Sequence, residues 1–344
     1  MPDDRRSIWA WAMYDWANSA FATTVMAGFF PLFFKGYWAD PADPTQSTFA
    51  LGMANAAASV IVAALAPFLG AVADRGSAKK RFLFLFTFLG CIMTGGLWLV
   101  ERGEWPLAVL LYVAANVGFS GGMSFYDALL PGIAAKQRVD YASSLGYALG
   151  YLGGGLLFLV NVLMYLKPAL FGIADSPTAI RIAFLSVALW WALFSLPVFL
   201  FVAEPAVGDP VSLGRAVRLG WRQLTETLRA VRRLRVVGLF LLAYWLYIDG
   251  VDTIIRMAVD FGISLGFPAG ALITALLLVQ FIAFPATLLY LKIAARLGVK
   301  RAILVAVAGY CGITVVGYFM DRQWHFFVLA AGVALFQGSV QALS

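Results

Sequence analysis

The chain of 344 residues alternates between long apolar runs and short polar stretches. Crossing a hydrocarbon core about 30 Å thick takes roughly 20 helical residues. About ten runs have that length, and each predicts one membrane-spanning helix. They cover residues 8–34, 49–72, 82–100, 106–126, 144–166, 179–202, 236–259, 269–291, 302–319 and 325–343. The predicted fold class is an all-α polytopic membrane protein with about ten spans.

Composition agrees with this pattern. Hydrophobic residues make up 62% of the chain, charged residues make up 12%, and the mean hydropathy is +0.85. An average soluble domain has about 25% charged residues. A large soluble domain is therefore excluded as the fold class.

The basic residues predict the orientation. Of the 25 Lys and Arg residues, 19 fall in five stretches that would share one side of the membrane. These are the amino terminus and residues 73–81, 135–142, 203–235 and 292–301. The positive-inside rule makes that side cytoplasmic. The net charge of +7 is thus a topology signal, and its spread over separate short loops speaks against nucleic-acid binding.

A charged turn beginning at Gly70 returns in altered form near residue 291. Without a gap, the copies pair Arg75 with Arg296, Lys79 with Lys300, and Lys80 with Arg301. Asp74 corresponds to Ala295, so the acid is kept only in the first copy. Cys91 and Cys311, inside the third and ninth runs, repeat at nearly the same interval. The chain is therefore expected to contain two helical bundles related by an internal repeat.

The repeat predicts three regions. Residues 1–202 form an amino-terminal six-helix bundle, and residues 203–235 form a cytoplasmic amphipathic linker rich in arginine. Residues 236–344 supply only four spans, where a second bundle matching the first would need six. We therefore expect a chain cut short at its carboxyl end, with a natural ten-span protein as the alternative.

Several motifs resemble one known family. The charged turn is similar to the cytoplasmic signature of the major facilitator superfamily, with Ser77 where that family usually has glycine. Five further segments resemble its vacuolar-effluxer-like branch: Tyr14–Phe21, Phe125–Pro131, Ser144–Gly155, Tyr247–Gly250 and Phe336–Ser344. The resemblance implies a major-facilitator-type fold with an expected twelve spans. It also implies a permease for a small polar solute, with amino acids or related metabolites first, in the plasma membrane of a prokaryote.

Charged residues inside the seventh run are candidates for the transport site. Each costs roughly 2.5–3.5 kcal/mol at the centre of a membrane helix, so such residues usually face a cavity or a partner. Asp249, Asp252, Arg256 and Asp260 share one helix face, and Arg256 is four residues from each of its two acidic neighbours. They predict either a carboxylate–guanidinium network that switches between states or a static salt bridge. We favour the static pair for Arg256 with Asp260 and a functional role for Asp249.

The first run contributes Asp15 and Asn18, three residues apart. The resemblance places Asn116 with Ser120, and Gln337 with Gln341, near Asp15, because these runs line the cavity in the superfamily. The predicted transport cavity consists of Asp15, Asn18, Asn116, Asp249, Asp252, Arg256, Gln337 and Gln341. Proton coupling through Asp249 or Asp15 is the favoured hypothesis.

The charged turn is expected to form a cytoplasmic gate. A solvated loop explains its basic residues but not Asp74. The resemblance implies that Asp74 pairs with basic residues and with a helix amino terminus of the other bundle, where a carboxylate is favoured. The predicted gate residues are Gly70, Asp74, Arg75, Lys79, Lys80, Arg296, Lys300 and Arg301.

Glycines recur in the fifth run at Gly146, Gly150, Gly153, Gly154 and Gly155. No strand precedes them, so they do not predict a phosphate-binding loop. Small residues at this spacing let helices approach closely, and we interpret them as a sliding surface between the bundles.

Catalytic chemistry has little support. The sequence holds one histidine, His325, and its two cysteines lack metal-ligand spacing. We therefore expect no enzyme, no metal and no cofactor, and a driving force from an ion gradient or the solute. Protons, the solute and the lipid bilayer are the expected partners. The competing hypothesis is a membrane sensor or scaffold that kept the fold without transport.

Overall fold

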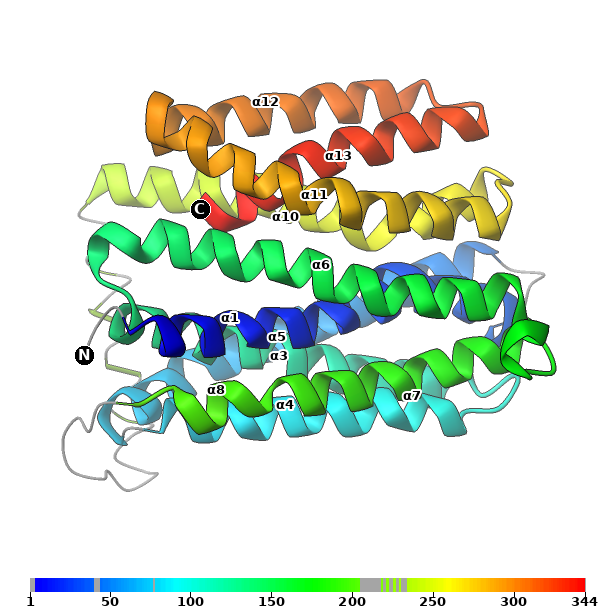
Figure 1. Cartoon of the computed structure of the whole chain (residues 1–344), viewed down its shortest axis with the longest axis horizontal. Helices are drawn as coiled ribbons and strands as arrows, with labels where there is room; N and C mark the ends of the chain where they lie inside the picture. The colour runs from blue at the N-terminus through cyan, green and yellow to red at the C-terminus, as the bar shows by residue number, and fades with distance from the viewer. Residues whose placement is uncertain are drawn as a thin grey trace.

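The computed structural model describes residues 4–39, 44–76, 78–204, 218, 221–222, 225–226, 229 and 234–343, without the side chains of 44, 67–68, 71–76, 136 and 339. These residues form helices joined by short turns, and this part of the chain contains no β-strand (Figure 1). The helices are α1 (Arg5–Ala20), α2 (Phe30–Phe33), α3 (Pro44–Gly76), α4 (Lys79–Gly96), α5 (Trp105–Ile133), α6 (Val139–Leu166), α7 (Ser176–Phe194), α8 (Leu196–Phe201), α10 (Arg235–Ser264), α11 (Ala269–Leu297), α12 (Val299–Tyr318) and α13 (Gln323–Leu343).

Ten helical segments in the described residues are long and apolar enough to cross a membrane. Each of the ten predicted runs coincides with one of them, so the predicted all-α class is confirmed. Most helices continue a few residues past the apolar runs. A helix satisfies its own backbone hydrogen bonds, so no N–H or C=O group inside it is left unpaired where it continues beyond the hydrocarbon core.

The first span is the most deeply buried of the ten. It runs from Arg5 to Trp38, because two π-helical segments, Phe21–Phe29 and Phe34–Trp38, join and extend α1 and α2. Its aromatic side chains form the centre of a large core. Phe30 stacks on Tyr112 of α5 at 3.9 Å between ring centroids, and Trp38 stacks on Phe184 of α7 at 5.8 Å.

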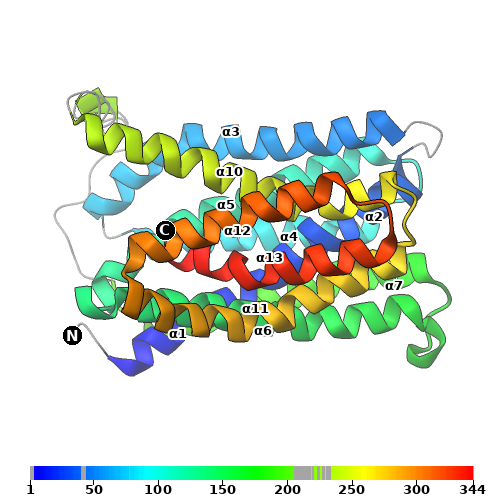
Figure 2. The same cartoon turned by 90° about the horizontal axis from the view of Figure 1, so that it is seen from above.

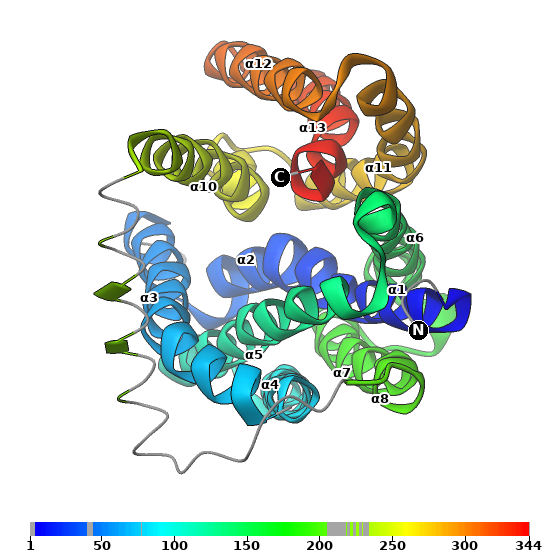
Figure 3. The same ribbon diagram turned by 90° about the vertical axis from the view of Figure 1, so that its left-hand side faces the viewer.

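The helices lie side by side along the length of the molecule (Figures 1 and 2). Seen end-on, α10 to α13 lie on one side and the helices of the first 201 residues on the other, with α6 next to α11 (Figure 3). We call the end with the amino terminus and the α3–α4 turn the basic end, and the other the opposite end. The predicted linker, 203–235, lies largely outside the described residues.

Close helix packing within the first half of the chain depends on glycine. Added Cβ atoms at Gly146, Gly150, Gly153 and Gly154 would all lie within 3 Å of atoms of Asp15, Ser19 or Trp16. These four glycines therefore pack α6 against α1, and their interpretation as a surface between the bundles is wrong. The reason is geometric, because they share the helix face that meets the parallel first span. Gly155 points the other way and faces Gln280 of α11.

The α4–α5 contact gives a test of this packing. Gly118→Ala adds a methyl group that would lie 2.5 Å from the backbone nitrogen of Gly90 and 2.7 Å from its Cα. Since backbone cannot move aside as a side chain does, we expect a loss of about 1–3 kcal/mol, seen as a lower thermal midpoint in detergent. Gly95→Ala is the matched control, because its new methyl group would lie 3.5 Å from Ala188. Equal midpoints for the two variants would contradict this account.

Candidate functional site

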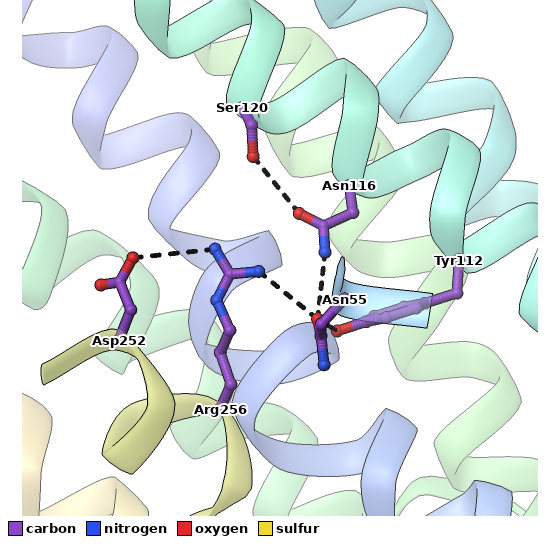
Figure 4. Close-up of polar contacts among 6 residues, drawn as sticks. All are labelled: Asn55, Tyr112, Asn116, Ser120, Asp252 and Arg256. Carbon is purple, nitrogen blue, oxygen red and sulfur yellow. Dashed lines mark hydrogen bonds and ion pairs between the residues drawn. The ribbon is translucent and has the colours of Figure 1, made fainter. Parts of the chain in front are cut away.

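A polar network connects helices from both halves of the chain (Figure 4). Its hub is the side-chain oxygen of Asn55 on α3. This Oδ1 atom accepts hydrogen bonds from the Tyr112 hydroxyl at 2.9 Å, from Asn116 Nδ2 at 3.2 Å and from Arg256 Nη1 at 3.4 Å. The network therefore joins α3 and α5 to α10 through one amide oxygen.

Helical spacing positions the donors. Tyr112, Asn116 and Ser120 lie four residues apart on α5 and form one stripe. Ser120 donates to Asn116 Oδ1 at 3.3 Å, which fixes the amide so that its nitrogen points towards Asn55. Tyr112 and Asn116 are fully buried.

On α10, Arg256 and Asp252 are one helical turn apart. Their closest atoms are 3.9 Å apart, at the outer limit of an ion pair. The Arg256 side chain is 18% exposed and that of Asp252 is 44% exposed. The network therefore borders accessible space on the Asp252 side.

A buried ion pair closes the opposite end between the halves. Lys35, in the first span, lies 2.8 Å from Asp260 of α10, and the two side chains are only 8% and 3% exposed. Thr48 of α3 donates to the second carboxylate oxygen at 2.9 Å. The expected pairing of Arg256 with Asp260 is wrong, because Asp260 pairs with the lysine of another helix at shorter range.

Asp15 lies closer to the basic end. Its carboxylate accepts a hydrogen bond from the Tyr126 hydroxyl at 3.1 Å, and both residues are buried. Tyr126 is held by stacking on Trp11 at 4.2 Å. Gly146 makes room for the carboxylate, because a Cβ there would lie 2.6 Å from Asp15 Oδ2. Asp127 directly follows Tyr126 on α5.

One face of α5 connects these two groups. Ser120, Ser124 and Asp127 follow one another at helical spacing, and Ser124 and Asp127 are exposed although they lie inside a membrane-spanning helix. Polar groups facing lipid would be costly, so such a face usually lines an aqueous path. This polar face runs from the central network towards the basic end.

The remaining predicted cavity residues make other contacts. Asn18 is buried and donates to the sulfur of Met123. Gln341 accepts a hydrogen bond from Tyr151 of α6 at 2.9 Å, and Gln337 is buried on the same helix, α13. Asp249 is exposed on α10, one helical turn from Asp252. Of the eight predicted cavity residues, the structure thus joins Asn116, Asp252 and Arg256 in one polar network.

The predicted gate residues are divided as well. The side chains of Asp74 and Arg75 lie outside the described residues, and Gly70 lies on α3. Lys79 and Lys80 begin α4, where their backbone N–H groups donate to Glu204 at 2.7 and 3.2 Å. Lys80 Nζ also donates to Val202 O at 2.6 Å, so this part of the turn is held within the first half.

The second copy of the turn differs from the first in its exposure. Arg296, Lys300 and Arg301 are all exposed at the basic end. Arg296 lies in the last turn of α11, and the other two lie in the first turn of α12.

Sequence reasoning missed the hub and the closing pair. Asn55 is a lone polar residue among alanines in the second run, and a search for isolated intramembrane amides would have found it. Lys35 stands just beyond the predicted first run, 8–34, and so outside the predicted spans. No sequence signal pairs it with Asp260, 225 residues later. Among the described residues no group of three or more metal-binding side chains occurs.

Comparison with known proteins identifies the family. The profile described as "Vacuole effluxer Atg22 like" matches residues 44–344. An uncharacterized MFS-type transporter, YxiO of Bacillus subtilis, is 35% identical over 97% of this chain and 78% of its own length. Autophagy-related protein 22 of Yarrowia lipolytica is 23% identical over 66% of this chain, which spans half of that protein.

Solved structures show the same fold. The xylose transporter XylE from E. coli, in a partially occluded inward open conformation, superposes with a TM-score of 0.69 at 15% identity, covering 98% of this chain and 86% of that one. A D-xylose-proton symporter gives a TM-score of 0.63 at 14% identity, with 97% and 81% of the two chains covered. The chain is therefore an integral membrane protein of the vacuole effluxer Atg22-like family, with the fold of major facilitator superfamily transporters.

Proposed function

We propose that this protein is a secondary active transporter that moves a small polar solute, with amino acids first, by alternating access. The observation that carries the proposal is the network around Asn55, because it joins helices of both halves inside the membrane-spanning segments. Contacts of this kind can form and break as two bundles rock about a central site. The description of the family as vacuole effluxer Atg22-like supports solute efflux.

The distribution of contacts supports a path open to one side. The Lys35–Asp260 pair holds the halves together at the opposite end, whereas the exposed polar face of α5 runs towards the basic end. Positive charge favours the cytoplasmic side, so we assign the basic end to the cytoplasm. The bacterial relative supports a plasma membrane of a prokaryote as the location. The cytoplasmic gate would then be the charged turn and its second copy.

We assign proton coupling to Asp15. It is buried beside Tyr126, and its neighbour Asp127 is exposed on the path, so a proton can reach the pair from the basic end. A buried carboxylate within a membrane protein is a common proton carrier. Asp249 is the weaker candidate, because it is exposed and lies apart from this pair.

Flux through reconstituted vesicles tests the transport proposal. Proteoliposomes that contain the full chain should exchange a radiolabelled L-amino acid from a mixed panel, and a pH gradient should drive its net movement. Asp15→Asn should retain solute exchange but lose the response to the pH gradient, since an amide side chain cannot take up and release a proton. Asp140→Asn, at an exposed position in the first turn of α6, is the control and should behave as the wild type.

A gradient response that persists in Asp15→Asn would exclude this coupling site. No flux or exchange of any solute would instead favour the competing role, a sensor or scaffold that kept the fold.

The closing pair makes a separate prediction. Lys35→Met leaves Asp260 buried with Thr48 but without a counter-charge, and breaking a buried pair in this way costs roughly 3–5 kcal/mol. The thermal midpoint in detergent should fall well below that of the wild type. Adding Asp260→Asn should restore most of the loss, because the amide can still accept from Thr48 and carries no charge.

Lys300→Met serves as the control, because that lysine is exposed. If Lys35→Met lowers the midpoint no more than Lys300→Met, the pair does not hold the two halves together.

A further inference from the structure

The Asn55 oxygen receives more donors than it can satisfy. A carbonyl oxygen has two lone pairs, but three donors converge on this atom, at 2.9, 3.2 and 3.4 Å. The longest of the three bonds is the one from Arg256, the only charged donor (Figure 4). One neutral amide oxygen therefore cannot satisfy all three donors.

The charge of Arg256 is also poorly balanced. Its paired acid in the structure, Asp252, lies 3.9 Å away and is 44% exposed, so water screens that interaction. A guanidinium group binds a planar carboxylate best, through two parallel N–H bonds at about 2.7–2.9 Å. Neither contact of Arg256 has this geometry.

We propose that Arg256, Tyr112 and Asn116 form a subsite for the carboxylate group of the solute, and that Asn55 occupies these donors when the carboxylate does not. The inference rests on the proposed transport function and names the class of solute for that site. A carboxylate has two oxygens and about four acceptor positions, which match three converging donors better than one amide oxygen. Its negative charge also meets Arg256 directly.

The position of Asp252 selects among anions. Arg256 supplies one positive charge, so the second negative charge of a dianion such as hydrogen phosphate would have no cation to compensate it and would face Asp252. Among the described residues, ion pairs bring no other cation to this network. The subsite therefore fits a singly charged carboxylate.

Replacement of Asn55 by the solute on the same donors would couple solute binding to a movement of α10. Asn55 and the two α5 donors belong to the first half of the chain, whereas Arg256 belongs to α10. A carboxylate bound to all three donors replaces a long 3.4 Å contact between the halves with shorter, charge-assisted ones. Solute binding would thus draw α10 towards α5.

Thermal stabilisation of the purified full-length protein tests the subsite. The probes are the L-amino acids and L-lactate, each beside its primary carboxamide, together with inorganic phosphate. We expect at least one carboxylate to raise the thermal midpoint while its carboxamide and phosphate do not. Stabilisation by a carboxamide equal to that by its acid, or by phosphate, would overturn the proposal, as would the absence of any stabilising carboxylate.

Two variants then locate the site. Arg256→Gln should weaken binding of that carboxylate by about 30-fold or more, because it removes a charged donor from a partly buried position. Asn55→Asp keeps the shape of the side chain but places a permanent carboxylate on the same donors. It should reduce binding to a similar extent while the thermal midpoint without solute stays at or above the wild-type value. A purely structural role for Asn55 would leave binding unchanged in this variant.

Arg181→Gln is the control. Arg181 is also a partly buried arginine on a membrane helix, where it donates to Trp98 O at 2.8 Å, and its loss should not change the affinity. Wild-type affinity in Asn55→Asp would overturn the proposal even if Arg256→Gln does not fold.

The outcome separates this inference from the transport proposal. Carboxylate binding that depends on Arg256, without flux in vesicles, would support the subsite and contradict transport. Flux of an amine or a sugar that Arg256→Gln carries at the wild-type rate would support transport and contradict the subsite.

Discussion

Charged and amide side chains inside membrane helices must find their partners within the protein, and the structure depends on this constraint. Desolvating an ion is costly unless an opposite charge or several hydrogen bonds replace the lost water. Lys35 and Asp260 meet this requirement with a 2.8 Å ion pair and a bond from Thr48. Because these partners come from separate helices, the constraint fixes how the first span, α3 and α10 lie relative to one another.

Apolar packing and polar pairing have different tasks in this fold. Within the first half, glycines let helices touch backbone to backbone, as α6 does against α1 and α5 against α4. Between the halves, Gly155 also packs closely against Gln280. Polar contacts recur there, including Thr23 with Gln280 and Asn55 with Arg256. Tight glycine contacts make a rigid unit. Hydrogen bonds between the units can exchange partners, as the proposed alternating access requires.

At the candidate site, close helix packing and polar contacts together position the functional side chains. Asn116 presents its amide to Asn55 because Ser120 fixes it from one turn away, and Asp15 is held by Tyr126 in a space that Gly146 leaves open. Each group is positioned by neighbours on its own or an adjacent helix. This arrangement gives donors and acceptors of defined direction.

Much of the fold could be read from the sequence, because membrane spans need only length and hydrophobicity. All ten helical runs were predicted. Asp15, Asn116 and Arg256 could be singled out as candidates, since a polar residue in an apolar run stands out. Partners were harder to predict. Asp260 was assigned to Arg256 by helical spacing, and the glycines of α6 were assigned to the wrong neighbour.

The sequence by itself determined which segments cross the membrane and which polar groups enter it, since both depend on local hydrophobicity. Only the tertiary structure decided which groups meet. Helical spacing places side chains on a face but does not say which helix lies opposite. Lys35 and Asp260, or Asn55 and Arg256, are brought together by the packing of helices more than 200 residues apart.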